Sequence, residues 1–597
     1  MEQLNAGFLE SDVVDYLTFE PIIICNYRVI IFFRCPWTER VDESIKLAKS
    51  LNKKVLFDID DLVIDTKYTD LIPYIKTLSP KEKEIYDDGV IRIGKTLILC
   101  DAATTTTEAL AKELKNYVSN VFINRNVASE EMWKLSKRAL ILKKNQTVPN
   151  DYIIIGYFSG SITHNSDIDI IKNALIKILR RYSYVKLLLF GEISYPEYLE
   201  EFSEQIILKN FADWKQLPLL ISNVDINIAP LEVTIFNEAK SENKWVEASL
   251  VKVPTIASNV GAFKHVIIHN ETGLLCDNVK DWYLSLKTLI NNEPLRKYIG
   301  ENAHKICRKK YNTLHTGRKL SQYINSIANK HIGFFIPSLL NSGGMYVILK
   351  HACILQDEGW DVDLIVPNVT INIYEFQEHK FNLINLHNTI MSSQYDIIVA
   401  TLYSTVFTAL SYYKTKKRLY LVQNYETNFY PYGNYFKPLA EKTYSVPFNL
   451  QYITISKWCE KWLWKKYLSN NGQPKDWYRV DKFLNSIPHD EVIEIYEQCD
   501  ILLKSSWLES FSYPPLEMMA TGGYVIVVSN GGNKEYLKDG YNCLLYKLGE
   551  LDGAVDNINR LVSDEKLQEH LYANGIITAQ ERDWKVFKDK IISLYDD

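Results

Sequence analysis

The sequence of 597 residues lacks the features that would mark a membrane-spanning, secreted or zinc-binding protein. No apolar run approaches the roughly 20 residues that a bilayer-spanning helix needs. The opening stretch, MEQLNAGFLESDVVDYLTFE, is acidic and lacks the basic-then-apolar order of a secretory signal. The nine cysteines include no CxxC pair, so neither a disulfide framework nor a zinc site is indicated. We therefore expect a cytoplasmic protein with reduced thiols.

Basic residues are also not in excess, which argues against a nucleic acid partner. The formal net charge is −5, and 24% of the residues are charged. Hydrophobic residues make up 47%, as in an ordinary soluble protein. Because a single hydrophobic core rarely grows beyond about 250–300 residues, we expect roughly two to four domains.

Short apolar runs alternate with longer amphipathic ones along the chain. Between the apolar runs, ESIKLAKSL, TEALAKELKNYV and IDIIKNALIKILRRY have apolar residues at helical spacing. This alternation predicts an α/β fold with parallel sheets, whose ligands bind beyond the carboxyl ends of the strands. Buried strands are expected at 53–61, 152–160, 185–192, 224–232 and 254–261.

One long pattern occurs twice. Residues 244–276 and 514–546 both contain a helix with a glutamate, a turn, a strand, and then Ser-Asn followed by glycine. The offset of about 270 residues far exceeds the periods of solenoid repeats, so we interpret it as duplication of a whole module. The boundary is expected near 325–332, where SQYINSIANK gives way to HIGFFIPSLLNSGG.

The stretch ESFSYPPLEMMATGG at 509–523 places Glu509 and Glu517 eight residues apart. A helix is expected to begin at Pro514–Pro515, because the first helical turn does not need the missing proline N–H, and to end at Gly522–Gly523. Glu517 then lies in the first turn, whose free N–H groups suit an anion such as a diphosphate. An isolated glutamate pair at this spacing would more often be surface charge.

The complete string resembles the Glu-x7-Glu motif of the family 4 glycosyltransferases, whose GT-B fold consists of two facing Rossmann-like domains. The resemblance implies transfer of a sugar from a nucleotide-activated co-substrate, with retention and without a metal or cofactor. It implies that Glu517 binds the donor ribose and that Glu509 lies by the sugar and diphosphate. The backbone at Ser510–Phe511 would lie near the phosphates. An inverting reaction with an aspartate base stays open.

Two further segments of the second half carry the resemblance. Ser342, Gly343 and Gly344 follow an expected strand and match the glycine turn that these enzymes place against donor phosphates and acceptor. QNYETNFYPYG at 423–433 resembles bacterial rhamnosyltransferases that build surface polysaccharide from dTDP-rhamnose. The resemblance implies a glycan or lipid-linked glycan acceptor. It leaves open both a peripheral contact with the inner membrane face and the oligomeric state.

The first half resembles the same superfamily in FDIDD (57–61), GYFSGSITHNSDI (156–168) and residues 236–258. The position eight before Glu247 is Ala239, so the first glutamate of the motif is absent. Lys240, Lys244 and Glu247 have the spacing of one helix face, where the lysines would neutralise a diphosphate and Glu247 would bind the ribose. The alternative is a charged surface helix with internal ion pairs.

A turn of small residues is expected after the strand at 152–160, where it would permit close backbone approach to a phosphate. His164 would contact the sugar or phosphate, although a lone histidine is more often structural. The donor-binding residues expected here are Gly156, Ser159, Gly160, Ser161 and His164.

Three acids, Asp58, Asp60 and Asp61, close an expected strand on the acceptor side. They have the chemistry to hold a metal, to orient acceptor hydroxyls or to act as a general base. They would equally cap local backbone groups. We favour an acceptor-side or structural role over a metal site. Arg34 follows another strand and is expected to pair with these acids.

The second module is shorter than the first. TTTT (104–107) to VDINIAP (224–230) spans about 120 residues, whereas ITIS (453–456) to CDILLKSS (499–506) spans about 45, so two strand–helix units are expected to be missing. The first module in turn begins without an obvious glycine-turn strand.

We therefore predict tandem GT-B-like modules, of which the second is truncated, with the first holding the more complete donor site. The predicted catalytic residues are Lys240, Lys244, Glu247 and Glu509. The alternative function is a decayed tandem transferase that serves as a glycan-binding or scaffolding subunit in polysaccharide assembly. The expected domains are 1–130 (acceptor side), 131–328 (nucleotide sugar), 329–456 (acceptor side) and 457–597 (truncated nucleotide sugar).

Overall fold

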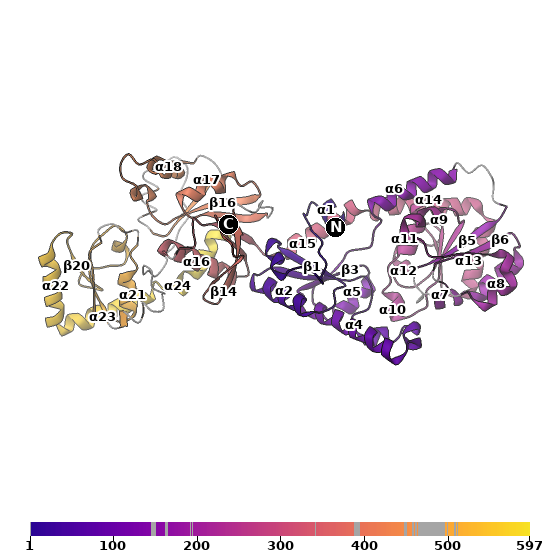
Figure 1. The fold of residues 1–597 in the computed structure, drawn as a ribbon, viewed down its shortest axis with the longest axis horizontal. Coiled ribbons are helices and arrows are strands. Elements are labelled where there is room, and N and C mark those ends of the chain that lie inside the picture. Colours follow the sequence, from indigo (N-terminus) through magenta and orange to yellow (C-terminus); the bar gives the residue numbers. More distant parts are fainter. Residues whose placement is uncertain are drawn as a thin grey trace. The chain divides into compact units, whose positions relative to one another are not determined.

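The computed structural model divides the chain into two compact units (Figure 1). Unit 1 comprises Met1–Ile23, Val29–Leu47 and Lys54–Ala328, and unit 2 comprises Ile24–Arg28, Ala48–Lys53 and Asn329–Asp597. The described residues are 2–144, 151–160, 165–191, 193, 195–340, 342–386, 394–446, 450–456, 459, 463, 493, 496–497, 499–506, 509 and 511–596.

Unit 1 begins with a parallel four-stranded sheet in the order β1-β2-β3-β4. Its strands are β1 (Val29–Phe33), β2 (Lys54–Asp58), β3 (Ala102–Thr105) and β4 (Val121–Ile123). Its helices are α1 (Glu2–Ala6), α2 (Glu39–Ser50), α3 (Thr66–Thr69), α4 (Pro80–Leu99) and α5 (Glu108–Leu114). The start of α4 is fixed by its sequence, because Ser79 and Glu82 form a reciprocal capping box ahead of Pro80.

A parallel six-stranded sheet follows in unit 1, in the order β10-β9-β8-β5-β6-β7. The central strand β5 (Ile153–Ser159) pairs with both β6 (Val185–Gly191) and β8 (Ile226–Ala229), so the winding direction reverses at its carboxyl end. In open α/β sheets such a switch point forms the ligand crevice. The remaining strands are β7 (Ile206–Lys209), β9 (Thr255–Ser258) and β10 (Leu274–Cys276).

Helices pack on both faces of this sheet. One face buries Ile155, Leu187 and residues of α8 and α13, and the other buries Phe158, Leu188 and residues of α6, α9 and α11. The helices are α6 (Glu130–Lys144), α7 (Asn165–Asp169), α8 (Lys172–Arg181), α9 (Leu217–Ser222), α10 (Ile235–Glu238), α11 (Asn243–Leu250), α12 (Phe263–Val266), α13 (Val279–Asn291) and α14 (Glu293–Lys310). The last helix of unit 1, α15 (Thr313–Ile327), packs on α1.

Unit 2 begins with a seven-stranded sheet in the order β13-β14-β12-β11-β15-β16-β17. All pairs are parallel except β13 with β14, which form an antiparallel pair that the sequence did not predict. The strands are β11 (His331–Phe335), β12 (Asp361–Val366), β13 (Ile373–Phe376), β14 (His379–Asn385), β15 (Tyr395–Ala400), β16 (Thr415–Val422) and β17 (Gln451–Thr454). Its helices are α16 (Gly343–Asp357), α17 (Tyr403–Ser411) and α18 (Phe436–Lys442).

The last sheet of unit 2 has three described strands in the parallel order β18-β19-β20. The C-terminal helix α24 packs against α16, and Tyr595 shares a 2.7 Å hydrogen bond with His351. The elements are β18 (Ile501–Lys504), α21 (Pro514–Ala520), β19 (Tyr524–Val528), β20 (Leu544–Tyr546), α22 (Leu551–Ser563), α23 (Glu565–Gln580) and α24 (Trp584–Asp596). Short 3-10 helices are η1 (Pro21–Asn26), η2 (Pro73–Thr77), η4 (Glu197–Gln205), η5 (Trp214–Gln216), η6 (Glu426–Phe429), η7 (Thr443–Ser445) and η9 (Asn533–Glu535).

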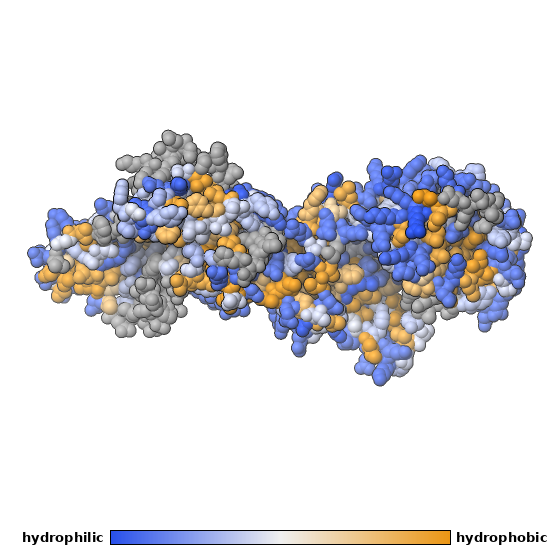
Figure 2. Space-filling model, turned by 45° about the horizontal axis from the view of Figure 1, so that its top comes forward, coloured by the Kyte–Doolittle hydropathy of each residue, from blue (hydrophilic) through white to orange (hydrophobic). Residues whose placement is uncertain are grey.

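The predicted α/β class with parallel, Rossmann-like sheets is confirmed, and the five predicted strands are β2, β5, β6, β8 and β9. The helical spacing in IDIIKNALIKILRRY corresponds mainly to α8, and the first two residues of this stretch end α7. None of the described helices combines the length and apolar character that crossing a bilayer requires. Figure 2 shows hydrophobic residues on the surface in separate patches among hydrophilic ones.

A buried charge network belongs to the core of unit 2, and its cation comes from early in the chain. Lys53 Nζ lies 3.2 and 3.1 Å from the two carboxylate oxygens of Asp361. His331 Nε2 lies 2.9 Å from Asp363, which also accepts a 2.7 Å hydrogen bond from Tyr395. Burial opposes the charge of Lys53, but Asp361 and Asp363 raise its pKa. Burial alone would raise the pKa of Asp363, but His331 and Lys53 lower it to about 2.

This network also accounts for a group of metal-ligand type. Among the described residues, potential metal-ligand atoms of His331, Asp361 and Asp363 lie within 4.8 Å of one another. The amine of Lys53 already neutralises Asp361. We therefore interpret the cluster as a charge-compensated part of the core.

Candidate functional site in unit 1

Lys244 and Glu247 lie on α11, whose other face packs into the core through Trp245, Val246 and Ala248. The apolar residues orient the helix and leave the two charged side chains together on the remaining face. Lys240 does not share this helix. It lies in the connection between α10 and α11, so the prediction of one helical face for all three residues is wrong. Its own N–H donates to the carbonyl of Asn237 at 3.2 Å.

The amine of Lys244 is buried without a hydrogen-bond partner among the described residues. It lies 4.7 Å from the centroid of the Tyr157 ring, on β5. Burial lowers the pKa of Lys244 to about 8, although the nearby charge of Asp167 opposes that shift. An ammonium group held this way has three N–H donors to offer to an anion.

Glu247 is half-buried beside Lys244. Burial raises its pKa to about 7, and the charge of Lys244 acts in the opposite direction. Burial therefore moves the pKa values of an acid and a base on one helix face toward neutrality. Shifted pKa values of this kind are typical of functional sites, although structural ion pairs produce them too.

Lys240 brings the other sheet of unit 1 into the same cluster. Its amine lies 3.9 Å from Asp61 and 4.7 Å from the ring centroid of Phe236. Asp61 follows β2, so a lysine and an acid from the two sheets of one unit lie close together. A second contact between the two parts of unit 1 is a 2.9 Å hydrogen bond from the hydroxyl of Thr107 to the carbonyl of Ala239.

The predicted ion pairs of Arg34 are present. Its Nε lies 2.8 Å from Asp60, and its terminal nitrogen contacts Asp61. Arg34 has φ +45°, in the left-handed region that costs a non-glycine residue about 1 kcal/mol. Asp58 accepts a 2.6 Å hydrogen bond from Thr104, and burial raises its pKa. The three acids are thus already partnered, which favours a positioning role over an open metal site.

The small residues near β5 do not form one turn. Gly156 lies inside β5, where a Cβ would come within 2.9 Å of Val224, so this glycine serves strand packing. Ser159 ends the strand in a buried position, whereas Gly160 is exposed with open space around it. The predicted turn therefore begins only at Ser159. Ser161 and His164 lie outside the described residues.

Asp167 and Tyr157 are residues that the sequence reasoning missed. Asp167 is buried and accepts hydrogen bonds from the backbone N–H of Glu232 at 3.3 Å and from Asn237 at 3.4 Å. It therefore fixes the loop that carries α10 while facing the Lys244 charge. The sequence could have indicated Asp167, because it lies in GYFSGSITHNSDI, after a strand and therefore at the carboxyl edge of the sheet.

The corresponding residues in unit 2

Glu517 lies in the first turn of α21, as predicted, and only 3% of its surface is exposed. The helix ends at Ala520, and Gly522, just after the C-cap residue, has φ +84°. Burial raises the pKa of Tyr496, and a hydrogen bond to Glu517 adds to that shift.

Glu509 is already ion-paired. Lys504, the last residue of β18, contacts its carboxylate, and the hydroxyl of Ser506 donates to the same oxygen at 2.7 Å. Sequence reasoning did not find Lys504, although it ends a predicted strand. Both contacts go to the same oxygen, so the second carboxylate oxygen keeps its lone pairs for further donors.

The backbone before α21 is held by aromatic packing. Phe511 is buried against Tyr513 and Tyr536, and Tyr536 donates to the carbonyl of Ser512, which has φ +75°. Ser510 lies outside the described residues.

The predicted glycine turn of unit 2 starts a helix. Ser342 caps α16 by accepting a 3.2 Å hydrogen bond from the N–H of Met345, and Gly343 is the first helical residue. A Cβ on Gly344 would lie 3.2 Å from the side-chain oxygen of Gln423. The glycine turn thus contacts the first residue of QNYETNFYPYG.

Comparison with known proteins

Two segments match one protein family. The model of the family described as glycosyl transferases group 1 matches residues 138–306 and 480–578, together a little under half of the chain. The first segment contains all six strands of the six-stranded sheet, and the second contains β18, β19 and β20.

Curated relatives are similar over part of their length. The capsular polysaccharide biosynthesis glycosyltransferase CapM of Staphylococcus aureus is 26% identical over 238 residues, 38% of this chain and 60% of CapM. The N,N'-diacetylbacillosaminyl-diphospho-undecaprenol alpha-1,3-N-acetylgalactosaminyltransferase of Campylobacter jejuni is 28% identical over 106 residues, 18% of this chain and 28% of that protein. The O-antigen biosynthesis protein RfbC of Myxococcus xanthus is 29% identical over 109 residues, 18% of this chain and 8% of RfbC. The chain spans less than two thirds of the length of each of these relatives.

Solved structures are similar at low identity. HepE from Anabaena, in complex with UDP and glucose, gives a TM-score of 0.37 at 13% identity, covering 51% of this chain and 80% of HepE. A glycosyltransferase from Rickettsia africae gives a TM-score of 0.37 at 17% identity, covering 54% of this chain and 81% of that chain.

The family matches cover two segments of the chain. Over these segments it is similar to the group 1 glycosyltransferases. The relatives named above include proteins of capsular and O-antigen polysaccharide biosynthesis.

Proposed function

We propose that this chain transfers a sugar from a nucleotide-sugar donor to a growing surface polysaccharide or lipid-linked glycan, and that unit 1 holds the working donor site. The observation that carries this proposal is the buried amine of Lys244 beside β5, at the switch point of the six-stranded sheet, which has no hydrogen-bond partner in the part of the chain that the structure describes. A buried cation without a partner costs free energy, and a diphosphate would supply the missing hydrogen bonds.

The proposed mechanism is mainly electrostatic. Lys244 and Lys240 stabilise the negative charge that develops on the leaving diphosphate, and Glu247 accepts hydrogen bonds from the donor ribose. Asp167 holds the adjoining loop in place. Arg34, Asp60 and Asp61 orient the acceptor hydroxyl on the opposite sheet of unit 1. The donor within this proposal is dTDP-rhamnose or a UDP-sugar, with retention at the anomeric carbon.

Within the same proposal, unit 2 derives from duplication of a module and lacks an independent donor site. Two observations support a duplication. The order β8-β9-β10 recurs as β18-β19-β20, and the parallel bridge between His269 and Gly273 recurs between Asp539 and Cys543. The shorter spacing between matching segments, about 45 residues in unit 2 against about 120 in unit 1, supports a non-catalytic, glycan-binding or scaffolding role for unit 2.

Separate substitutions of Glu247 and Glu517 test the assignment. We would measure hydrolysis of dTDP-, UDP- and GDP-sugars without acceptor by the full chain. Glu247→Gln is expected to lower kcat/KM about 100-fold, in line with the loss of one well-placed polar contact, whereas Glu517→Gln leaves it within about twofold. The reverse result would move the working site to unit 2. If neither variant changes turnover of a sugar that the parent chain hydrolyses, the donor site is elsewhere.

A further inference from the structure

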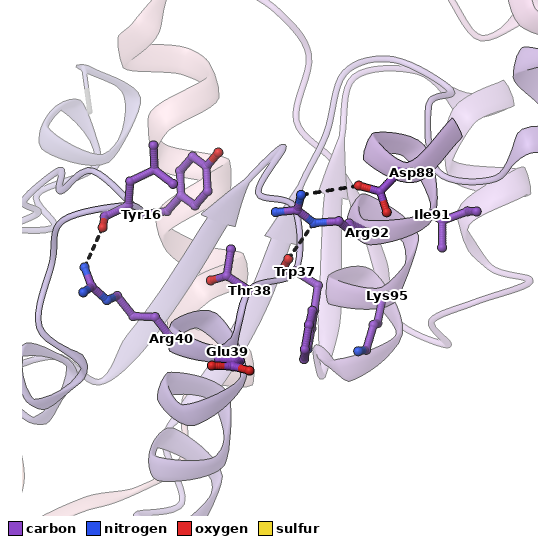
Figure 3. Close-up of a pocket in the computed structure, with 10 residues that line it drawn as sticks. Tyr16, Trp37, Thr38, Glu39, Arg40, Asp88, Ile91, Arg92 and Lys95 are labelled. Carbon is purple, nitrogen blue, oxygen red and sulfur yellow. Dashed lines mark hydrogen bonds and ion pairs between the residues drawn. The ribbon is translucent and has the colours of Figure 1, made fainter. Parts of the chain in front are cut away.

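A cavity of about 680 Å³ lies in the N-terminal part of unit 1, and none of the donor-site residues lines it (Figure 3). One wall comes from the loop between β1 and α2, and another comes from α4. The loop follows the carboxyl end of β1, the edge at which parallel sheets bind ligands. The volume falls in the range of about 300–1,000 Å³ that is usual for small-molecule sites.

An aromatic ring is held firmly in one wall of this cavity. The backbone N–H of Trp37 donates to the carbonyl of Arg92 at 2.9 Å, and Arg92 Nε donates back to the carbonyl of Trp37 at 2.9 Å. The amine of Lys95 lies 3.0 Å from the centroid of the Trp37 ring. This reciprocal pair of hydrogen bonds joins the loop to α4 and fixes the ring. The exposed Lys95 side chain covers one face of the ring, so a sugar stacks on that face once the amine moves from the ring to the phosphate of the sugar.

Cations outnumber acids in the lining. Arg40, Arg92 and Lys95 are opposed by Glu39 and Asp88, and Asp88 lies 3.5 Å from Arg92. Arg40 donates to the carbonyl of Leu17 at 2.5 Å, which uses one of the five N–H donors of a guanidinium group. Lys95 is exposed and forms no ion pair with a described residue. The combination of a stacking ring and available cations suits a phosphorylated sugar.

The rim of the cavity has an apolar side as well. Leu17 and Ile91 both line it and are 60% and 58% exposed. Two aliphatic side chains beside cations would accommodate the first units of a lipid attached to the phosphate. A free sugar phosphate would leave these side chains in water.

We propose that this cavity binds a sugar phosphate, with Trp37 stacked on the sugar and with Arg40 and Lys95 holding the phosphate. Its use as the acceptor site rests on the proposed function of the chain. The shared chemistry is the phosphate next to a pyranose, whether the phosphate is free or carries a lipid.

Binding to the full chain tests the proposal without any turnover. Isothermal titration calorimetry would compare glucose 1-phosphate, glucose and inorganic phosphate. Glucose 1-phosphate is expected to bind at least tenfold tighter than glucose. The double variant Arg40→Gln/Lys95→Gln should weaken glucose 1-phosphate at least tenfold, while Lys49→Gln/Lys81→Gln, an equal charge change on α2 and α4 outside the cavity, leaves it unchanged. Trp37→Leu should weaken glucose 1-phosphate and leave inorganic phosphate unchanged.

The outcomes separate the pocket from the proposed function. Equal affinity of the parent chain and the folded double variant for glucose 1-phosphate overturns the pocket assignment, as does equal affinity of the parent for glucose and glucose 1-phosphate. Tighter binding of farnesyl phosphoryl glucose than of glucose 1-phosphate, lost in the double variant, supports the pocket and assigns a lipid-linked source. Tighter binding of glucose 1-phosphate, also lost in the double variant, supports the pocket and assigns a free sugar phosphate as its ligand. If the Glu247 experiment disproves the donor site while glucose 1-phosphate still binds as expected, the cavity remains a sugar-phosphate site but is no longer assigned as the acceptor site.

Discussion

At the scale of single residues, Lys244 and Glu247 give the proposed donor site a narrow pH range. Burial lowers the pKa of Lys244 to about 8 and raises that of Glu247 to about 7. The lysine is charged below its pKa, and the carboxyl group is charged above its pKa. Both groups therefore carry charge together only in the interval between these values.

We expect a bell-shaped profile of kcat/KM for donor hydrolysis, with its maximum between about pH 7 and 8. Above the maximum, activity should fall toward a tenfold loss per pH unit, because Lys244 loses the proton that balances the diphosphate. Lys244→Arg keeps the charge and should extend activity to higher pH, whereas Lys244→Met should be slow at every pH. Initial rates in constant-ionic-strength buffers measure this. An alkaline limb that is identical in Lys244→Arg and the parent would assign that limb to another group.

At the scale of elements, much of the framework follows from local pattern. Apolar runs predict β2, β5 and β9, and the proline pair predicts the start of α21, because burial and backbone chemistry act over a few residues. The ion pairs of Arg34 also follow, since residues after neighbouring parallel strands meet at one edge.

Other features depend on contacts that no local pattern shows. The spacing of Lys240 and Lys244 fits one helix, yet the chain breaks between α10 and α11, where Lys240 lies near Asp61 on the other sheet. The sequence predicts Gly156 in a turn, but it lies inside a strand, where Val224 leaves too little room for a Cβ. The partner of Glu509 is equally hidden, because no local pattern shows that Lys504, five residues earlier, contacts its carboxylate.

The helix that carries one wall of the cavity depends on its capping box. Ser79→Ala removes the side-chain acceptor at the start of α4 and should destabilise that helix by about 1 kcal/mol. We expect amides in its first turn to exchange with deuterium about fivefold faster, a rate change that corresponds to that free energy. Ser79→Asp retains an acceptor and should exchange like the parent. Equal acceleration in both variants would show that the cap is not what holds the turn.

At the scale of the whole molecule, unit 2 includes two segments from early in the chain, Ile24–Arg28 and Ala48–Lys53. The carbonyl of Cys25 accepts a 3.0 Å hydrogen bond from Asn382, and Lys53 is paired with Asp361 inside the core. Breaking a buried ion pair by removing one partner leaves the other charge without compensation.

Lys53→Met should therefore destabilise unit 2 by about 3 kcal/mol or more. Hydrogen exchange followed by mass spectrometry should show loss of protection in β11, β12 and β15, while the six-stranded sheet of unit 1 keeps its protection. Lys54→Met, the same change one residue further along on β2, is the control and should leave unit 2 unaffected. Unchanged protection in the Lys53 variant would mean that the network contributes little to stability.

The position of Lys53 also has a consequence for how the chain is made. Lys53 leaves the ribosome 308 residues before Asp361. At synthesis rates of about 5–20 residues per second, roughly 15–60 seconds pass before the carboxylate partner of this ammonium group is synthesised. The second half of the newborn polypeptide must therefore recruit a segment translated long before it, and a gene fragment that encodes only residues 329–597 would yield a protein with an unfilled charge site in its core.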